Sequence, residues 1–463
     1  MTTHQTIQLL RAYESQNVLF YEPDGSWPIV WERARGVHVW DAEGKKYLDL
    51  TAAFGVAAAG HANPRIVRAG QRQMAKLLHA MGDVHPHAPK ARLARELSRI
   101  TFERWPNESK ARSSKSGVST GKTIFCNSGF EAVEAALKTA ILATGRRGVI
   151  AFAGAYHGLG YGALNATHRD HFRGPFRSQL GEFGHFVPFP TSAGKRKRKE
   201  PHSEDKKRET RHLVSCPELA ALEARIRSLC RRERIGAILV EPIQARGGIN
   251  LPLPEFLPLL RQLCDEYGAL LILDEIYTGF GRTGKWFACE HSGVVPDVIC
   301  LGKALTGGFP LSACVGRAQL MDAAWPVSTG EAIHTSTFLG HPVGCAMALA
   351  QIGEIRRLKL CERSARLGAF LISELTKFPS LKSEVIRRVR GAGLMVGLEL
   401  RNADGSPATA KSLQVIKAML RHGFILLPEG AHGNVISFTP PLTITEAQLI
   451  GMVSALQKVL LGE

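Results

Sequence analysis

The sequence contains no run of about 18 apolar residues, the length that an α-helix needs to cross a bilayer. Its first ten residues have neither the charged start nor the apolar core of a secretory signal. No Cys-X-X-Cys pair occurs, and the nine cysteines are scattered, several of them inside apolar runs. We therefore expect no membrane segment, no metal site and buried, reduced thiols, which favour a cytoplasmic location.

Acidic residues are scarce relative to basic ones, 41 against 59, so the formal charge is +18. A polyanionic partner has to be considered for such a chain. Nine Lys or Arg and four Asp or Glu fall between Lys195 and Arg211, and this local run is typical of a solvated surface insert. It lacks interleaved aromatic residues for base stacking, which disfavours a nucleic-acid-binding function.

Short apolar runs alternate with helical periodicity in the middle of the 463-residue chain. Each run is too short for a helix and apolar on both faces, as in a strand of a parallel sheet covered by helices. These runs predict strands over 148–152, 235–240, 269–273 and 298–301.

Around this core the pattern predicts a hairpin over 37–50, helices over 64–79, 88–100, 217–231, 254–267 and 343–358, and a polar loop over 105–123. The last hundred residues alternate helix and short strand and predict a smaller α+β domain.

The four predicted strands all lead into a polar or reactive residue. The first leads to Tyr156, the second to Glu241, the third to Asp274 and the fourth, through a glycine, to Lys303. Because open α/β sheets bind ligands at the carboxyl ends of their strands, these four side chains are predicted to face one crevice.

The residue types in that crevice point to one cofactor. Asn127, Ser128 and Gly129 open a helix whose free N–H groups can bind a phosphate, although a simply capped helix is the alternative. A buried Asp274 needs a cationic partner such as a pyridinium nitrogen, and a desolvated Lys303 can form a Schiff base. Phosphate, pyridinium and aldehyde together describe pyridoxal 5′-phosphate.

At these residues the sequence resembles the class III aminotransferases, a family of fold type I that includes ornithine, acetylornithine and 4-aminobutyrate aminotransferases. The likeness runs in order from about residue 28 to the end. It is carried by 36–49, 60–64, 127–136, 156–158, 241–244, 274–284, 296–303, 337–338 and 390–395.

The resemblance implies cofactor roles. Lys303 would hold pyridoxal 5′-phosphate as a Schiff base and move protons, and Asp274 would keep its ring nitrogen protonated. Tyr156 and Ile276 would cover the two ring faces, and Gly129 with Phe130 would give N–H groups to the phosphate. The further residues that it assigns to the cofactor are Ser128, His157, Glu241, Gln244 and, from the neighbouring subunit, Thr337.

It also implies substrate contacts. Arg390 would bind a substrate carboxylate, and Glu241 would pair with Arg390 in the half-reaction that lacks this carboxylate. Phe54 and Val56 stand where family members line the substrate pocket.

Four departures from the family pattern lie close to these residues. Phe130 replaces a Ser or Thr, Ala245-Arg246 replaces Gly-Glu, Tyr277 replaces a Gln, and His341 replaces an Asn. The first departure removes a side-chain contact to the phosphate. The others lie near the pocket and leave the identity of the substrate undetermined.

The resemblance thus implies an α/β, fold type I homodimer with its active site at the subunit interface. Residues 60–330 would form the large domain, with a mostly parallel sheet covered by helices. Residues 1–59 and 331–463 would form the smaller α+β domain. The predicted activity is ping-pong transfer of an amino group from an amine or ω-amino acid to a 2-oxo acid, and an amino-acid racemase, epimerase or lyase is the alternative.

Two other motifs suggest different enzymes. Residues 158–163 match the start of a dinucleotide-binding fingerprint but lack a convincing acidic partner near Glu182. Residues 117–123 match a phosphate-binding loop only in part, because Ser116 stands where glycine is required and no apolar strand precedes it.

Overall fold

The computed structural model describes residues 1–22, 25–105, 119–191, 216–378 and 385–462. The basic run 195–211 and residues 106–118 lie outside this part of the chain.

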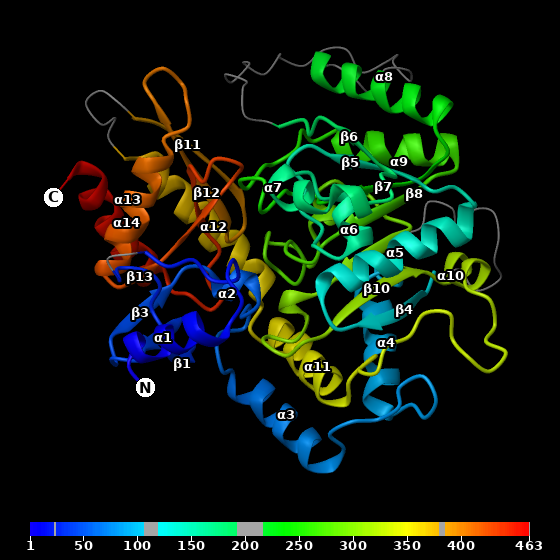
Figure 1. The fold of residues 1–463 in the computed structure, drawn as a ribbon, viewed down its shortest axis with the longest axis horizontal. Coiled ribbons are helices and arrows are strands. Elements are labelled where there is room, and N and C mark those ends of the chain that lie inside the picture. Colours follow the sequence, from blue (N-terminus) through cyan, green and yellow to red (C-terminus); the bar gives the residue numbers. More distant parts are fainter. Residues whose placement is uncertain (23–24, 106–118, 192–215, 379–384, 463) are drawn as a thin grey trace.

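A seven-stranded sheet forms the centre of the molecule (Figure 1), in the order β4-β10-β9-β8-β7-β5-β6. β10 runs antiparallel to its neighbours β4 and β9, and the remaining pairs are parallel. The mostly parallel sheet that the apolar runs predicted is thereby confirmed. Its strands are β4 (Gly121–Cys126), β5 (Gly148–Phe152), β6 (Gly184–Val187), β7 (Ile235–Val240), β8 (Leu270–Asp274), β9 (Val298–Leu301) and β10 (Ser312–Arg317).

Both faces of this sheet are buried. Val298 and Cys300 of β9 belong to a core cluster with residues of helix α5 (Gly129–Thr144), whereas Ile299 and Leu301 belong to the core that includes helix α9 (Phe256–Tyr267). Side chains alternate between the faces of a strand, so a strand covered on both sides must be apolar at every position.

Two four-stranded sheets lie beside the central one (left in Figure 1). One joins the N-terminal strands to β13, which pairs in parallel with β3, and the other has the order β11-β12-β15-β14. Segments from both ends of the chain therefore lie together. The strands are β1 (Trp31–Arg35), β2 (His38–Asp41), β3 (Lys46–Asp49), β11 (Val385–Ala392), β12 (Met395–Asn402), β13 (Phe424–Ile425), β14 (Leu427–Glu429) and β15 (Val435–Phe438).

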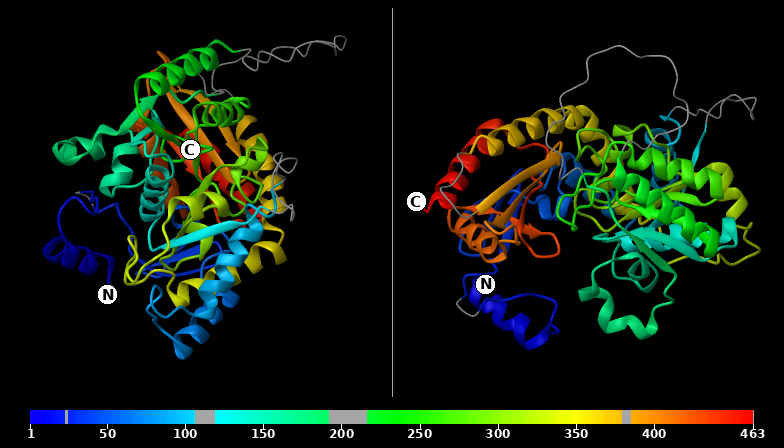
Figure 2. Two further views of the ribbon diagram at one scale, coloured as in Figure 1. Left: turned by 90° about the vertical axis from the view of Figure 1, so that its right-hand side faces the viewer. Right: turned by 90° about the horizontal axis from the view of Figure 1, so that it is seen from above.

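Helices enclose these sheets, and α11 packs on α3 and α4 below the central sheet (Figures 1 and 2). The other helices are α1 (Thr3–Tyr13), α2 (Ala52–Gly55), α3 (Pro64–Lys76), α4 (Ala88–Ile100), α6 (Tyr161–Ala166), α7 (Asp170–Arg173), α8 (Pro217–Arg232), α10 (Ala318–Ala324), α11 (Pro342–Arg357), α12 (Leu360–Thr376), α13 (Thr409–Arg421) and α14 (Glu446–Leu461), with short 3₁₀ turns η2 (Gly174–Gln179), η3 (Ala288–His291) and η4 (Lys303–Leu305).

The predicted loop over 105–123 needs one correction, because β4 already begins at Gly121. β4 is an edge strand whose first residues are partly exposed, so Lys122 and Thr123 sit in a strand without being apolar. The strands β6, β10 and β11 are further elements that the sequence pattern does not predict.

All nine cysteines lie in the described part of the chain, and none of them forms a disulfide. No helix among the described residues has the length and apolar character needed to cross a membrane.

Candidate active site

A cavity of about 580 Å³ opens at the carboxyl ends of β5, β7, β8 and β9. The four residues predicted to follow the strand ends all line this cavity: Tyr156, Glu241, Asp274 and Lys303. The described residues that line it are Phe54, Gly129, Phe130, Tyr156, His157, Gly158, Leu159, Glu241, Ala245, Arg246, Asp274, Ile276, Tyr277, Thr278 and Lys303.

Asp274 is the last residue of β8 and is held on both carboxylate oxygens. Its Oδ2 lies 2.8 Å from Nδ1 of the buried His157, and its Oδ1 accepts the Ile276 N–H at 3.1 Å. Nε2 of His157 is buried without a partner among the described residues. The anionic oxygen is thus fixed in a site with little solvent, where it can stabilise a cation.

Lys303 follows β9 and Gly302, and its backbone lies in the left-handed region at φ 42°. Few residues other than glycine adopt this conformation, and such outliers concentrate at functional sites. Burial lowers the pKa of the Lys303 amine, against the opposing charges of Asp274 and Glu241. A larger fraction of this amine is therefore neutral and nucleophilic than in an exposed lysine.

The N-terminus of α5 faces the same cavity. The side chain of Ser128, its N-cap residue, makes no capping hydrogen bond, and its Oγ is buried without a partner among the described residues. Gly129 and Phe130 of the first turn line the cavity. N–H groups that no side chain caps are suited to bind an anion.

Phe130 fits this turn because glycines face it. A Cβ built on Gly158 would lie 2.3 Å from the Phe130 Cβ, and one on Gly160 would lie 2.4 Å from its ring. The substitution of Ser or Thr by Phe at this position is thus accommodated by two neighbours without side chains.

Glu241 is buried, with its two oxygens bonded to separate backbone groups. Oε1 accepts the N–H of Tyr156 and Oε2 that of Ala245, each at 3.0 Å. Burial, and then the charge of Asp274, raise the pKa of Glu241 to about 7. The bond to Tyr156 fixes the backbone that carries an aromatic ring into the cavity.

Besides Phe130, the cavity residues Tyr277, Ala245 and Arg246 stand at positions where the sequence departs from the family pattern. Tyr277 places its ring 4.9 Å from Nζ of Lys303, and its hydroxyl lies 3.2 Å from that of Thr439. The Arg246 guanidinium lies 5.4 Å from the Tyr156 ring, and its Nε lies 3.6 Å from the buried Glu429. Glu429 had no signal in the sequence, because it comes from the distant strand β14.

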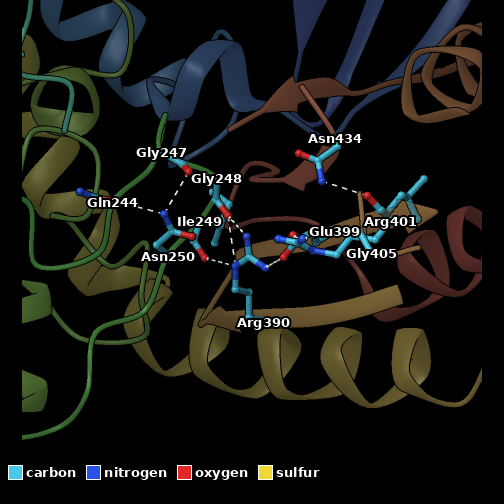
Figure 3. A network of polar contacts seen from close by, with 11 residues as sticks. Gln244, Gly247, Gly248, Ile249, Asn250, Arg390, Glu399, Arg401, Gly405 and Asn434 are labelled. Atoms are coloured by element: carbon cyan, nitrogen blue, oxygen red, sulfur yellow. Dashed lines mark hydrogen bonds and ion pairs between the residues drawn. The ribbon is translucent and has the colours of Figure 1, made fainter. Parts of the chain in front are cut away.

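Arg390 of β11 lies in a separate network (Figure 3). Its guanidinium donates to the carbonyl of Gly248 at 2.6 Å, to that of Ile249 at 2.8 Å and to Glu399. Arg390 is not among the described residues that line the cavity. In this structure Glu241 and Arg390 therefore do not pair with each other: Glu241 accepts backbone N–H groups, and Arg390 bonds to Glu399 and to two carbonyls.

The other predicted residues are not among the described residues that line the cavity. Gln244 donates to the Ala153 carbonyl at 2.8 Å and accepts from Asn250 at 3.1 Å. Val56 is partly buried and follows α2, whereas Thr337 is exposed. An exposed Thr337 remains available to a second copy of the chain.

Comparison with known proteins gives one consistent result. The family model described as aminotransferase class-III matches residues 20–460. The chain is 35% identical to an acetylornithine aminotransferase of Methanosarcina mazei (94% of this chain, 92% of the relative). It is 36% identical to the 5-aminovalerate aminotransferase DavT of Pseudomonas aeruginosa (91% of each). A solved ornithine aminotransferase of Toxoplasma gondii, described with partial occupancy of pyridoxal phosphate at its active site, superposes with a TM-score of 0.79 at 26% identity (100% and 95% covered).

The chain therefore belongs to the class III aminotransferase family, and its fold is that of the fold type I enzymes. It is a transaminase that uses pyridoxal 5′-phosphate to transfer amino groups to 2-oxo acids.

The residues present fit this cofactor. The uncapped turn of α5 suits the phosphate, the fixed Asp274 carboxylate suits the ring nitrogen, and the Lys303 amine suits the aldehyde. All three line one cavity, which is the spatial condition for a single molecule to reach them together.

Proposed function

We propose that the chain transfers the amino group of an ω-amino acid to a 2-oxo acid, pyruvate or 2-oxoglutarate, by a ping-pong mechanism at the Lys303 cavity. The observation that carries this proposal is the convergence of Lys303 and Asp274 on the cavity into which the α5 N-terminus opens. The names of the two relatives support the donor class, since acetylornithine and 5-aminovalerate both carry a primary amine remote from a carboxylate.

Lys303 is the covalent attachment point in this proposal. Its lowered pKa supplies a neutral amine that would bind the cofactor's aldehyde, and the same amine could accept and return a proton at Nζ. Tyr277 beside Nζ limits the directions in which this amine can swing.

Asp274 is the partner of the ring nitrogen, positioned by His157. The bound cofactor supplies an electron-withdrawing ring that stabilises negative charge on the substrate carbon. A fixed carboxylate in a buried site keeps the ring nitrogen protonated, and this protonation sustains the withdrawal.

Gly129 and Phe130 hold the phosphate through their N–H groups, with Ser128 Oγ as a further donor, and Tyr156 and Ile276 cover the ring. Three further residues support this site: His157 contacts Asp274, Glu241 accepts the N–H of Tyr156, and Gln244 donates to the Ala153 carbonyl. Phe54 lines the substrate side of the cavity, and Val56 is two residues further along the chain.

The active unit in this proposal is a homodimer in the cytoplasm, and Thr337 reaches the phosphate of the neighbouring subunit. Two observations support it: Thr337 is exposed, and the nine cysteines are not in disulfides. Residues 60–330 would form the large domain, and 1–59 with 331–463 the small one, which the pairing of β3 with β13 supports.

The test is initial-rate kinetics of the holoenzyme with 5-aminopentanoate and 2-oxoglutarate, each varied at several fixed levels of the other. We expect parallel double-reciprocal lines and one glutamate formed for each amine consumed. Racemisation or elimination of amino acids without any amino group passing to the oxo acid would overturn the proposal in favour of a racemase, epimerase or lyase.

A further inference from the structure

Arg246 is the arginine of the described cavity lining, and its donor groups are incompletely used. Its Nε is buried without a hydrogen-bond partner among the described residues, and its closest anion, Oε2 of Glu429, is 3.6 Å away. This separation is longer than a hydrogen bond. A guanidinium has five N–H donors in a planar fork, the geometry that binds a carboxylate through two parallel hydrogen bonds.

The guanidinium also lies close to the reacting groups. It stands 5.4 Å from the Tyr156 ring, and its charge contributes to lowering the pKa of Lys303. A third of the Arg246 side chain is exposed. A substrate that reaches Lys303 thus passes within range of a partly desolvated cation.

Arg390, the other arginine considered for this role, is already occupied. Its donors bond to the carbonyls of Gly248 and Ile249 and to Glu399, and only 13% of its side chain is exposed. A substrate carboxylate at Arg390 could use only the N–H groups that these bonds leave over, on a side chain that is not among the described residues lining the cavity.

We propose that Arg246 binds the carboxylate of the substrate and that Glu429 is the counter-ion it leaves when that carboxylate arrives. This assignment rests on the proposed function, because it concerns the ω-amino acid and oxo acid of that reaction. It makes Arg246 the residue that selects carboxylate-bearing substrates over simple amines.

Glu429 is suited to be a counter-ion that Arg246 can leave, because the negative charge of Glu429 is poorly stabilised. Burial raises its pKa to about 7, and Arg246 and Arg169 oppose that rise. A weakly held pair at 3.6 Å can be opened by a substrate carboxylate that makes two hydrogen bonds.

Two donors that differ only in a terminal carboxylate, 5-aminopentanoate and pentylamine, test the assignment in the holoenzyme. We expect Arg246→Gln to lower the ratio of their kcat/KM values by about 10- to 100-fold, the range for loss of a charge-assisted pair. The ratio in Arg246→Lys should lie between those of Arg246→Gln and the wild type. Arg169→Gln is the matched control, because it removes a charge that acts on Glu429 from a side chain outside the described cavity lining, and the ratio should stay within about twofold.

A binding measurement gives a second readout that does not depend on turnover. The dissociation constant of pentanoate, titrated calorimetrically into the holoenzyme, should rise at least about tenfold in Arg246→Gln. It should fall in Glu429→Gln, because the competing anion is gone. Misfolding cannot produce this opposite sign.

The possible outcomes are distinct. A ratio that falls in Arg390→Gln and not in Arg246→Gln would overturn the proposal and place the carboxylate at Arg390. Equal ratios in Arg246→Gln and the wild type, with unchanged pentanoate affinity, would also overturn it. Failure of the wild type to deaminate either donor would instead count against the proposed function.

Discussion

At the scale of single residues, the site depends on where a few charges are buried. Glu241, Asp274 and Lys303 share one cavity, and backbone N–H groups fix the carboxylates of Glu241 and Asp274. Their chemistry arises from this placement, because burial raises the pKa of Glu241 and lowers that of Lys303, and the same side chains at the surface would also be more mobile.

Asp274 provides the first prediction. Asp274→Asn keeps the shape but removes the negative charge, so we expect single-turnover deamination to slow by about 100- to 1000-fold, the range for losing one preorganised electrostatic contact. His157→Gln keeps the carboxylate and loses one hydrogen bond, so about tenfold is expected. Equal losses in both variants, measured by stopped-flow absorbance, would contradict a direct role for the charge.

Much of the site can be predicted from sequence, since strand ends are found from apolar runs. Tyr156, Glu241, Asp274 and Lys303 are predicted to share one crevice, and all four line the cavity. The partners of Arg390 cannot be foreseen in this way.

The hydrogen-bond partners of Arg390 depend on the path of the loop after β7. In this loop Ile249 has a positive φ of 51°, which its β-branched side chain disfavours. Glu429 is not predicted for a related reason, because only tertiary packing brings β14 to Arg246.

At the scale of elements, the apolar runs identify the strands that are buried on both faces. The edge strands β4 and β6 are not predicted because most of their side chains are partly or fully exposed, so few of their positions require apolar residues. The interior strand β10 is not predicted because Ser312, Gly316 and Arg317 interrupt its apolar pattern.

Helix α12 gives the second prediction. A Cβ on Gly368 would lie 1.9 Å from the carbonyl oxygen of Gly393, so Gly368→Ala should destabilise the fold by about 1–3 kcal/mol through overpacking. Gly353 of α11 is the matched control. Apart from its chain neighbours and the backbone of its own helix, no heavy atom of the described chain lies within 4 Å of a Cβ built there, so Gly353→Ala should stabilise by up to about 1 kcal/mol. Denaturant unfolding measures both, and a neutral Gly368→Ala would contradict the packing.

At the scale of the whole molecule, the fold buries carboxyl groups, and the titration of such groups makes the free energy of unfolding depend on pH. Glu275 accepts the N–H groups of Ala288 and Cys289 at 2.9 and 2.8 Å, yet burial raises its pKa from 4.5 to about 7. Between these pH values the folded chain keeps a proton that the unfolded chain has lost, so stability falls as pH rises.

For Glu275 this decline amounts to roughly 3 kcal/mol between pH 4.5 and 7, with no further contribution above that range. Glu275→Gln should remove it, whatever constant offset the lost hydrogen bond adds. Urea unfolding of both proteins at several pH values checks the difference in slope, and parallel curves would contradict the raised pKa.

The proposed dimer yields a prediction of complementation. Lys303→Ala and Thr337→Glu should each be inactive as homodimers, the second because a carboxylate repels the phosphate. Co-expressed as heterodimers, they should regain about half of the activity of a wild-type dimer, since one of the two sites then has both native residues. No recovery in purified heterodimers would mean that Thr337 does not act across the interface.

The most direct test of amino transfer at Lys303 is the absorption spectrum of the holoenzyme mixed with 5-aminopentanoate in the absence of any oxo acid. Transfer predicts that the visible cofactor band is lost in proportion to the sites, that 2-oxoglutarate restores it, and that Lys303→Ala shows no such cycle. A band that persists while a panel of ω-amino acids is epimerised or cleaved, or while none is changed, would contradict it.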